Sequence, residues 1–197
     1  MTDEPITLRD TVLAFARRFS FEEAHALQDE RLALSLFDET RRLGLHAHGA
    51  GAREVLSYAA LLHDIGYSAG YEEHHKTSFR LILAEPLPGM LPRDRLLVAH
   101  VARFHRGSLP DPSRHSSFAA LPAEDQELVR QLGAILRFAD GLDRTHSKAV
   151  AGLHCALQEG RLIVTLSPGA GDEMERWAAQ KKARWFEAVF GVTVELV

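Results

Sequence analysis

The sequence predicts a mainly α-helical protein that ends in a small unit of mixed α and β structure. Over the first two-thirds of the chain, apolar residues recur every three or four positions, and residues that start or stop helices lie between these repeats. Towards the end of the chain the spacing changes to alternation, which is typical of strands. We therefore expect a helical bundle domain over residues 1–147 and a hairpin–helix–strand extension over residues 148–197, packed on it.

Three helices are expected first, and each has its own boundary residues. Capping-box pairs, in which a hydroxyl residue lies three positions before an acidic one, start the first two helices: Thr7 with Asp10, and Ser20 with Glu23. Gly44 and Gly66 end the second and the third helix. The expected ranges are 8–19, 21–43 and 52–65.

The middle of the chain predicts three further helices separated by prolines and glycines. The first covers residues 72–84, before Pro86. The next begins at Pro92, which suits a first helical turn, and ends before Gly107. Prolines, glycine and serines then predict a surface loop over residues 107–121, and a long helix follows from 122 to 144.

The carboxyl-terminal segment predicts a hairpin, a helix and a third strand. Leu153, Cys155 and Leu157 alternate with other residues, Glu159-Gly160 offers a tight turn, and residues 162–166 are rich in β-formers. A loop over 167–172 leads to a helix, and residues 192–196 alternate again. The expected core residues of that last helix are Trp177, Trp185, Phe186 and Phe190.

Composition excludes several classes of protein. The 197 residues carry a net charge of −4, which argues against binding to duplex nucleic acid, because such binders carry a basic face. No apolar run approaches the roughly 20 residues of a membrane span, and the N-terminus lacks the pattern of a secretory signal. Cys155 is the single cysteine, so we expect a packed thiol in a cytoplasmic protein.

The eleven histidines are the unusual feature of the composition, and three segments place His or Asp where an apolar residue is expected. His63, followed by Asp64, shares a helical stripe with Leu56. His25 lies on the apolar stripe of the second helix, and Asp140 lies on that of the long helix. A buried ionised carboxylate is costly unless it is paired or binds a metal.

Each of these residues also has a purely structural alternative. A single histidine on an apolar face is more often a hydrogen-bonded core residue, and Asp140 could pair with Arg144 one turn later. Taken together, however, two histidines and two aspartates that project inward from three helices are typical of a divalent-metal site with nitrogen and oxygen ligands.

A second set of polar residues is expected around these four. His75 shares a stripe with Phe79 and Ile82, so we expect His75 to point inward and His74 to face solvent. Basic residues nearby could form an anion pocket, although each could equally be a solvated surface side chain. They are Lys76, Arg80, Arg103, Arg106, Arg137 and Arg144.

The order His25, His63-Asp64, Asp140 resembles the H…HD…D pattern of the HD-domain superfamily of metal-dependent phosphohydrolases. Four segments resemble the C-terminal HD region of exopolyphosphatase/guanosine pentaphosphate phosphatases, and together they span the chain from about residue 7 to its end. They are AALLHDIG (59–66), HHKTS (74–78), VARFHR (101–106) and LRFADGLDRTH (136–146).

This resemblance implies a role for each matching residue. His25, His63, Asp64 and Asp140 would hold a divalent ion (Mn, Mg, Fe, Zn or Ni), and Asp64, His75 and His105 would form the catalytic group. His75 and His105 would either bind a second metal ion or give a proton to the leaving group. The residues expected to bind substrate phosphate are Lys76, Arg103, Arg106 and Arg144.

The resemblance implies a phosphohydrolase that acts on a small phosphorylated or nucleotide compound. In the enzymes it resembles, catalysis is assigned to an actin-like portion that precedes the HD region, and this sequence begins about where the HD region begins. A non-catalytic module that binds polyphosphate or a guanosine polyphosphate beside a separate partner is therefore the alternative, and a scaffold with a structural metal is the third. The family is also compatible with a homodimer.

Overall fold

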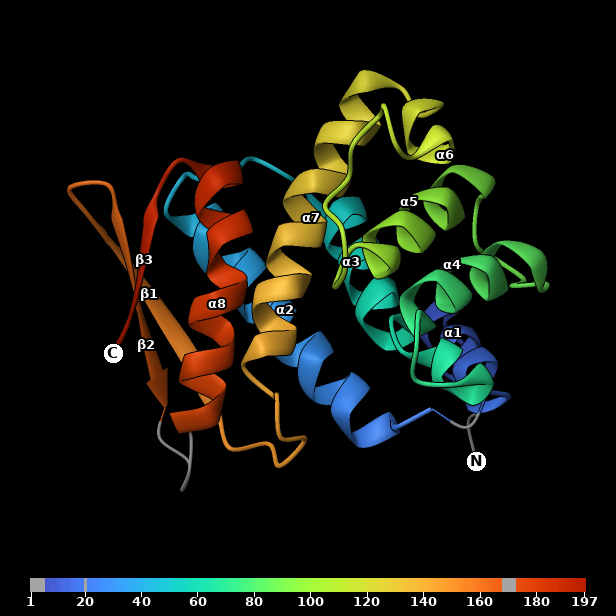
Figure 1. The fold of residues 1–197 in the computed structure, drawn as a ribbon, viewed down its shortest axis with the longest axis horizontal. Helices are drawn as coiled ribbons and strands as arrows, with labels where there is room; N and C mark the ends of the chain where they lie inside the picture. The colour runs from blue at the N-terminus through green and yellow to red at the C-terminus, as the bar shows by residue number, and fades with distance from the viewer. Residues whose placement is uncertain (1–5, 20, 168–172) are drawn as a thin grey trace.

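The fold was analysed in a computed structural model that describes residues 6–19, 21–167 and 173–197 (Figure 1). The described helices are α1 (Leu8–Arg17), α2 (Glu23–Arg42), α3 (Ala50–Leu62), the 3-10 helix η1 (Ile65–Ala69), α4 (His74–Ala84), α5 (Pro92–Arg103), α6 (Ser116–Ala119), α7 (Ala123–Gly141) and α8 (Glu173–Phe190). The described strands are β1 (Gly152–Gln158), β2 (Arg161–Ser167) and β3 (Thr193–Leu196). This arrangement confirms the mainly helical fold with a small α+β extension.

The helical part is organised around α2, α3, α5 and α7. Helix α7 contacts the other three, while α4 packs on α5 and α1 on α3. Leu36, Leu56 and Leu136 come from different helices and are fully buried in the shared core. Because the apolar stripes of these helices face one another, any polar residue on a stripe points into the middle of the bundle.

The carboxyl-terminal unit is a three-stranded sheet in the order β1-β2-β3, with α8 packed on β3 and α2 packed on β1 (Figure 1). Strands β1 and β2 are antiparallel, and Cys155 lies opposite Val164, whereas β3 runs parallel to β2. Helix α8 lies along α7, with the rings of Phe138 and Phe186 5.5 Å apart. The last fifty residues are thereby joined to the helix that carries Asp140.

Several expected boundaries are confirmed and others are corrected. The Thr7–Asp10 capping box is present, and Pro92 lies in the first turn of α5. The third helix is shorter than expected, because the chain tightens into η1 after His63-Asp64. The expected loop over 107–121 contains the short helix α6. Ser20 lies outside the described residues, and Glu22 takes the N-cap position of α2.

The expected core of the last helix is correct for two of its four aromatic residues. Trp185 and Phe186 are buried, and Phe190 is half-buried. Trp177 is 56% exposed, so its placement in the core is wrong. Eight residues separate Trp177 from Trp185, which rotates it by about 80° around the helix, away from α7. No helix among the described residues has the length and apolarity needed to cross a membrane.

Candidate metal centre

A buried cluster of imidazoles and carboxylates lies where α2, α3 and α7 meet. Helix α2 supplies His25 and Asp29, one turn apart on its inward face, the end of α3 supplies His63, and α7 supplies Asp140. One ligand atom from each of these four residues lies within 4.8 Å of the other three. Three of the four residues expected to bind a metal are thus together, and Asp64 follows directly at the junction of α3 and η1.

Asp29 is a member of this cluster that we did not predict. Its side chain is fully buried, and neither carboxylate oxygen has a hydrogen-bond partner among the described residues. Its Oδ2 lies 3.5 Å from Nε2 of His25 and 3.4 Å from Nε2 of His63. Burial raises the pKa of Asp29 to about 7, against the lowering effect of the two histidines. Asp29 lies three residues before Leu32 on the apolar stripe, so the same pattern that selected His25 could have selected it.

The histidines of the site present the same atom to its centre. Each Nδ1 is held by an oxygen acceptor: a carboxylate oxygen of Asp143 for His25 (2.8 Å) and the carbonyl oxygens of Ala60 for His63 (2.6 Å), Tyr71 for His74 (3.0 Å) and Ala102 for His105 (2.6 Å). A neutral ring that donates from Nδ1 keeps its lone pair on Nε2. Four Nε2 atoms therefore face carboxylate oxygens, an arrangement that attracts cations and is typical of metal-ligating histidines.

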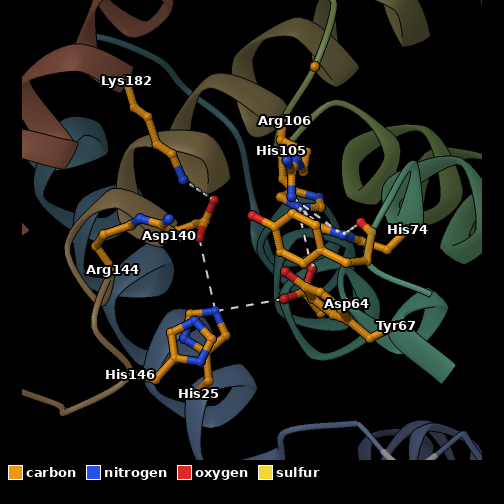
Figure 2. A pocket seen from close by; sticks show the side chains of 12 residues that line it. His25, Asp64, Tyr67, His74, His105, Arg106, Asp140, Arg144, His146 and Lys182 are labelled. Atoms are coloured by element: carbon orange, nitrogen blue, oxygen red, sulfur yellow. Dashed lines mark hydrogen bonds and ion pairs between the residues drawn. The ribbon is translucent and has the colours of Figure 1, made fainter.

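Asp64 lies between the cluster and a second group of donors (Figure 2). Its Oδ2 faces Nε2 of His25 at 3.9 Å, as the figure shows. The same oxygen lies 3.4 Å from Nε2 of His63. Its Oδ1 faces Nε2 of His74 at 3.0 Å and Nε2 of His105 at 3.4 Å. Asp64 thus faces two pairs of imidazole nitrogens: those of His25 and His63 through Oδ2, and those of His74 and His105 through Oδ1.

The orientation expected for His74 and His75 is reversed in the structure. His74 is buried against Asp64, whereas His75 is half-buried and does not line the pocket. Glu73 adopts a left-handed conformation with φ 55°, so α4 begins at His74, and the inward face carries His74 and Ser78. His75 instead lies under Gly107, where burial and the charge of nearby Arg103 lower the pKa of its imidazole to about 4.

The electrostatics of the cluster favour positive charge at its centre. Burial alone would lower the pKa of His63, but Asp64 and Asp29 outweigh burial and raise it to about 10. Burial would also raise the pKa of Asp64, yet the surrounding imidazoles, His63 foremost, hold it well below its usual range. Burial would likewise raise the pKa of Asp140, but Lys182, which lies against it, and the nearby His105 and His63 together hold it below its usual range. A cation bound here would replace protons that the carboxylates already attract.

A pocket of about 280 Å³ opens from the cluster to solvent. Figure 2 shows Asp140 and Lys182 on one side of it and Asp64, His74 and His105 on the other. Arg106 and Arg144 also line it, so three cationic side chains surround the opening to the carboxylates. Anionic phosphate groups are therefore suited to this pocket.

The structure brings some of the expected phosphate ligands to this pocket and leaves others outside it. Arg106 and Arg144 line the pocket. Lys76 and Arg103 instead line a separate hollow on the other side of the α4 and α5 ends. Asp140 pairs with Lys182 of α8 rather than with Arg144. Lys182 could not have been found from helical spacing, because it lies 42 residues away in the chain.

His146 is a further pocket residue that we did not predict. Its ring stacks on that of His25 at a centroid distance of 3.7 Å (Figure 2). Its Nδ1 lies 2.6 Å from Oε2 of Glu22. The backbone of His146 has φ 56°, a conformation rare for residues other than glycine. His146 contacts the ring of His25 from the more exposed side, while Asp143 holds that ring through its Nδ1.

This buried group of histidines and aspartates could hold a metal ion. It offers imidazole nitrogens and carboxylate oxygens, a mixture suited to Mn, Fe, Zn or Ni. Neither carboxylate oxygen of Asp29 nor Nε2 of His63 has a hydrogen-bond partner among the described residues, which a bound cation would explain.

Comparison with protein families agrees with the segments singled out in the sequence. The model of the family described as Ppx/GppA phosphatase, domain III, matches residues 8–178. This range contains His25, His63-Asp64 and Asp140, and it confirms the resemblance to exopolyphosphatase/guanosine pentaphosphate phosphatases; the link to the wider HD superfamily stays a prediction. The chain belongs to the Ppx/GppA phosphatase domain III family.

Proposed function

We propose that this protein is a metal-dependent phosphohydrolase of the HD type that acts on a small phosphorylated compound. The observation that carries the proposal is a buried carboxylate without a hydrogen-bond partner, that of Asp29, which faces Nε2 of His25 and of His63 beneath a cationic pocket. An uncompensated buried carboxylate costs several kcal/mol by order of magnitude, so a bound cation is the simplest partner. The cationic rim then supports an anionic substrate.

The residues that would hold the cation are His25, Asp29, His63, Asp64 and Asp140. When bound, a divalent cation supplies a water of lowered pKa and polarises a phosphoryl oxygen. Asp143 and the carbonyl of Ala60 orient two of the imidazoles, which is the outer-shell support that metal sites require.

The remaining pocket residues would bind the substrate and move protons. Arg106 and Arg144 would donate hydrogen bonds to phosphate oxygens and offset the charge that develops on them. His105 offers Nε2 with its lone pair towards Asp64, so this atom would accept a proton from attacking water and return it to the leaving oxygen. If His74, His105 and Asp64 hold a second cation, the same atom becomes a ligand, and the metal content distinguishes these roles.

The proposal is tested by metal content and hydrolysis in wild type and Asp64→Asn, with Asp38→Asn as the matched control. Asp38 pairs with Arg53 on the surface, so its loss leaves the cluster unchanged. We expect one or two cations per chain in wild type and control by elemental analysis. We also expect hydrolysis of p-nitrophenyl phosphate or nucleotides that falls by about 100-fold or more in Asp64→Asn.

Two results would contradict this proposal. Wild type that binds no cation after incubation with each candidate metal would remove its basis. Wild type that binds metal and phosphate, yet hydrolyses no phosphate compound, would assign the chain to the binding-module alternative. Circular dichroism of Asp64→Asn establishes that it remains folded.

A further inference from the structure

A second hollow, of about 390 Å³, lies where the ends of α4 and α5 meet the segment that leads into α6. These helices lie on the side of the molecule away from the sheet (Figure 1). Its lining includes four basic side chains and one acidic one, in a chain whose net charge is −4. The basic residues are Lys76, Arg80, Arg103 and Arg114.

Arg103 is the centre of this hollow. Its guanidinium lies 5.7 Å from the ring centroids of both Phe79 and Phe104, which fix its position. It forms no ion pair or hydrogen bond with any residue of the described chain, although it is half-buried. A partly desolvated guanidinium held in place with no counter-ion is suited to a bidentate oxyanion.

The other residues that line the hollow do not neutralise the charge of Arg103. The single acidic lining residue, Glu73, is exposed and already pairs with Lys76. Arg80 contacts only the carbonyl of Lys76 and the hydroxyl of Thr77. Arg114 is exposed, and the hydroxyls of Ser116 and Ser117 lie at the same rim, where they can donate hydrogen bonds.

The hollow is distinct from the metal centre but uses the same helix ends. At the start of α4, His74 lines the pocket of the candidate metal centre and Lys76 lines the hollow. At the end of α5, His105 lines the pocket and Arg103 lines the hollow. His75, packed under Gly107, lies between the two sites. We propose that the hollow is a second oxyanion site, which binds a phosphate group through Arg103, Arg80 and Arg114.

The phosphate could come from two sources: a free phosphate anion, or a second phosphate of a substrate seated in the metal pocket. The first test uses inorganic phosphate and metal-free protein in low salt, measured by calorimetry. We compare wild type with Arg103→Gln and Arg114→Gln, and we use Arg184→Gln, an exposed arginine on α8, as the matched control. Arg114 is exposed, so its variant stays informative if Arg103→Gln is unstable.

We expect the Kd for phosphate to rise about fivefold or more in Arg103→Gln and Arg114→Gln and to stay at the wild-type value in Arg184→Gln. We also expect Asp64→Asn to bind phosphate normally at this site, which makes the result independent of the proposed hydrolysis. If both hollow variants bind phosphate as Arg184→Gln does, the second site is overturned.

A series of alkanediol bisphosphates of increasing length distinguishes the two sources. Affinity that rises at one length, and that both Arg103→Gln and Arg144→Gln reduce, supports a substrate whose second phosphate reaches the hollow. Affinity equal to that of the monophosphate at every length, with sensitivity to Arg103→Gln kept, supports free phosphate.

Discussion

The buried histidines of this chain differ in whether a carboxylate lies within reach of the ring. His63 has Asp29 and Asp64 beside it, and its pKa is raised to about 10. His46 is also buried, although 9% of it is exposed, and its ring contacts the hydroxyl of Thr40 and the carbonyl of Phe37. Burial, with the nearby His48, lowers the pKa of His46 to about 4. The first environment attracts a cation, whereas the second keeps a neutral ring as part of the core.

We predict that His46 makes the protein acid-sensitive. The unfolded ring titrates near 6.5 and the folded ring near 4, so the unfolded state takes up the proton first. The stabilisation is complete above about pH 6.5 and is lost as the pH falls towards 4, by about 2 kcal/mol. Urea unfolding at pH 7.5 and 4.5 should show a smaller pH effect in His46→Gln than in wild type. His154→Gln, which changes an exposed histidine, should retain the wild-type pH effect. The prediction is refuted if the free energy of unfolding changes equally between the two pH values in all three proteins.

At the level of residues, helical spacing predicted three members of the buried His/Asp cluster, the candidate metal ligands that stand on apolar stripes. His25, His63 and Asp140 were found because a polar residue interrupts such a stripe. Lys182 was missed because the interaction that places it is between distant segments. His74 was misplaced because the left-handed Glu73 sets where α4 begins, and no residue pattern announces that conformation at a glutamate.

Among the elements, α7 is closely approached by α8, which packs on the turn of α7 that carries Asp140. A Cβ added at Gly141 would lie 2.7 Å from Cα and 2.9 Å from the backbone nitrogen of Ala179. At Gly133 an added Cβ would meet the ring of Trp185 at 2.7 Å. Glycine therefore permits the close contact of the two helices, and through it the pairing of Lys182 with Asp140.

We predict that Gly141→Ala destabilises the protein although alanine favours helices. The methyl group would force α8 away from α7, at a cost of about 1–3 kcal/mol that exceeds the gain in helix propensity. Gly51→Ala is the control, because an added Cβ there meets nothing within 4 Å in the first turn of α3. Thermal unfolding should show a lower Tm for Gly141→Ala and an unchanged or higher Tm for Gly51→Ala. The prediction fails if Gly141→Ala unfolds at or above the wild-type temperature.

The order and type of the elements followed from periodicity, but two junctions did not. The Leu- and Ala-rich third helix was expected to continue through residues 63–65, but α3 ends at Leu62 and the chain tightens into η1 after His63-Asp64. That change puts Asp64 at a corner, from which its two oxygens face different imidazoles. The helix α6 was missed because four residues carry too little periodicity to be recognised.

Considered as a whole, the molecule has one apolar core that extends from α1 to β3. Val12 in the first helix and Val194 in the last strand belong to the same cluster of buried residues. Cys155 lies in this cluster, fully buried, and burial raises the pKa of its thiol to about 12. The packed thiol expected from the sequence is thus confirmed, and its reaction can report on the opening of the sheet.

We predict that Cys155 reacts with Ellman's reagent only when the whole protein unfolds. Its labelling in urea should follow the loss of helical circular dichroism, because α7 and α8 share the core with the sheet. A Cys155→Ala protein with Thr165→Cys, an exposed position on β2, should react without urea. Labelling of Cys155 before the helices unfold would instead establish residues 148–197 as a separately folding unit.

The ion pair between Lys182 and Asp140 bears on how this chain can be recombined with its relatives. The family match ends at residue 178, four residues before the lysine that compensates a metal-site carboxylate. A chimera joined at the family boundary would combine α7 from one parent with the part of α8 after residue 178 from another. Asp140 would then lose the counter-charge of Lys182. Interchangeable modules of this protein must therefore keep α7 and all of α8 in one piece.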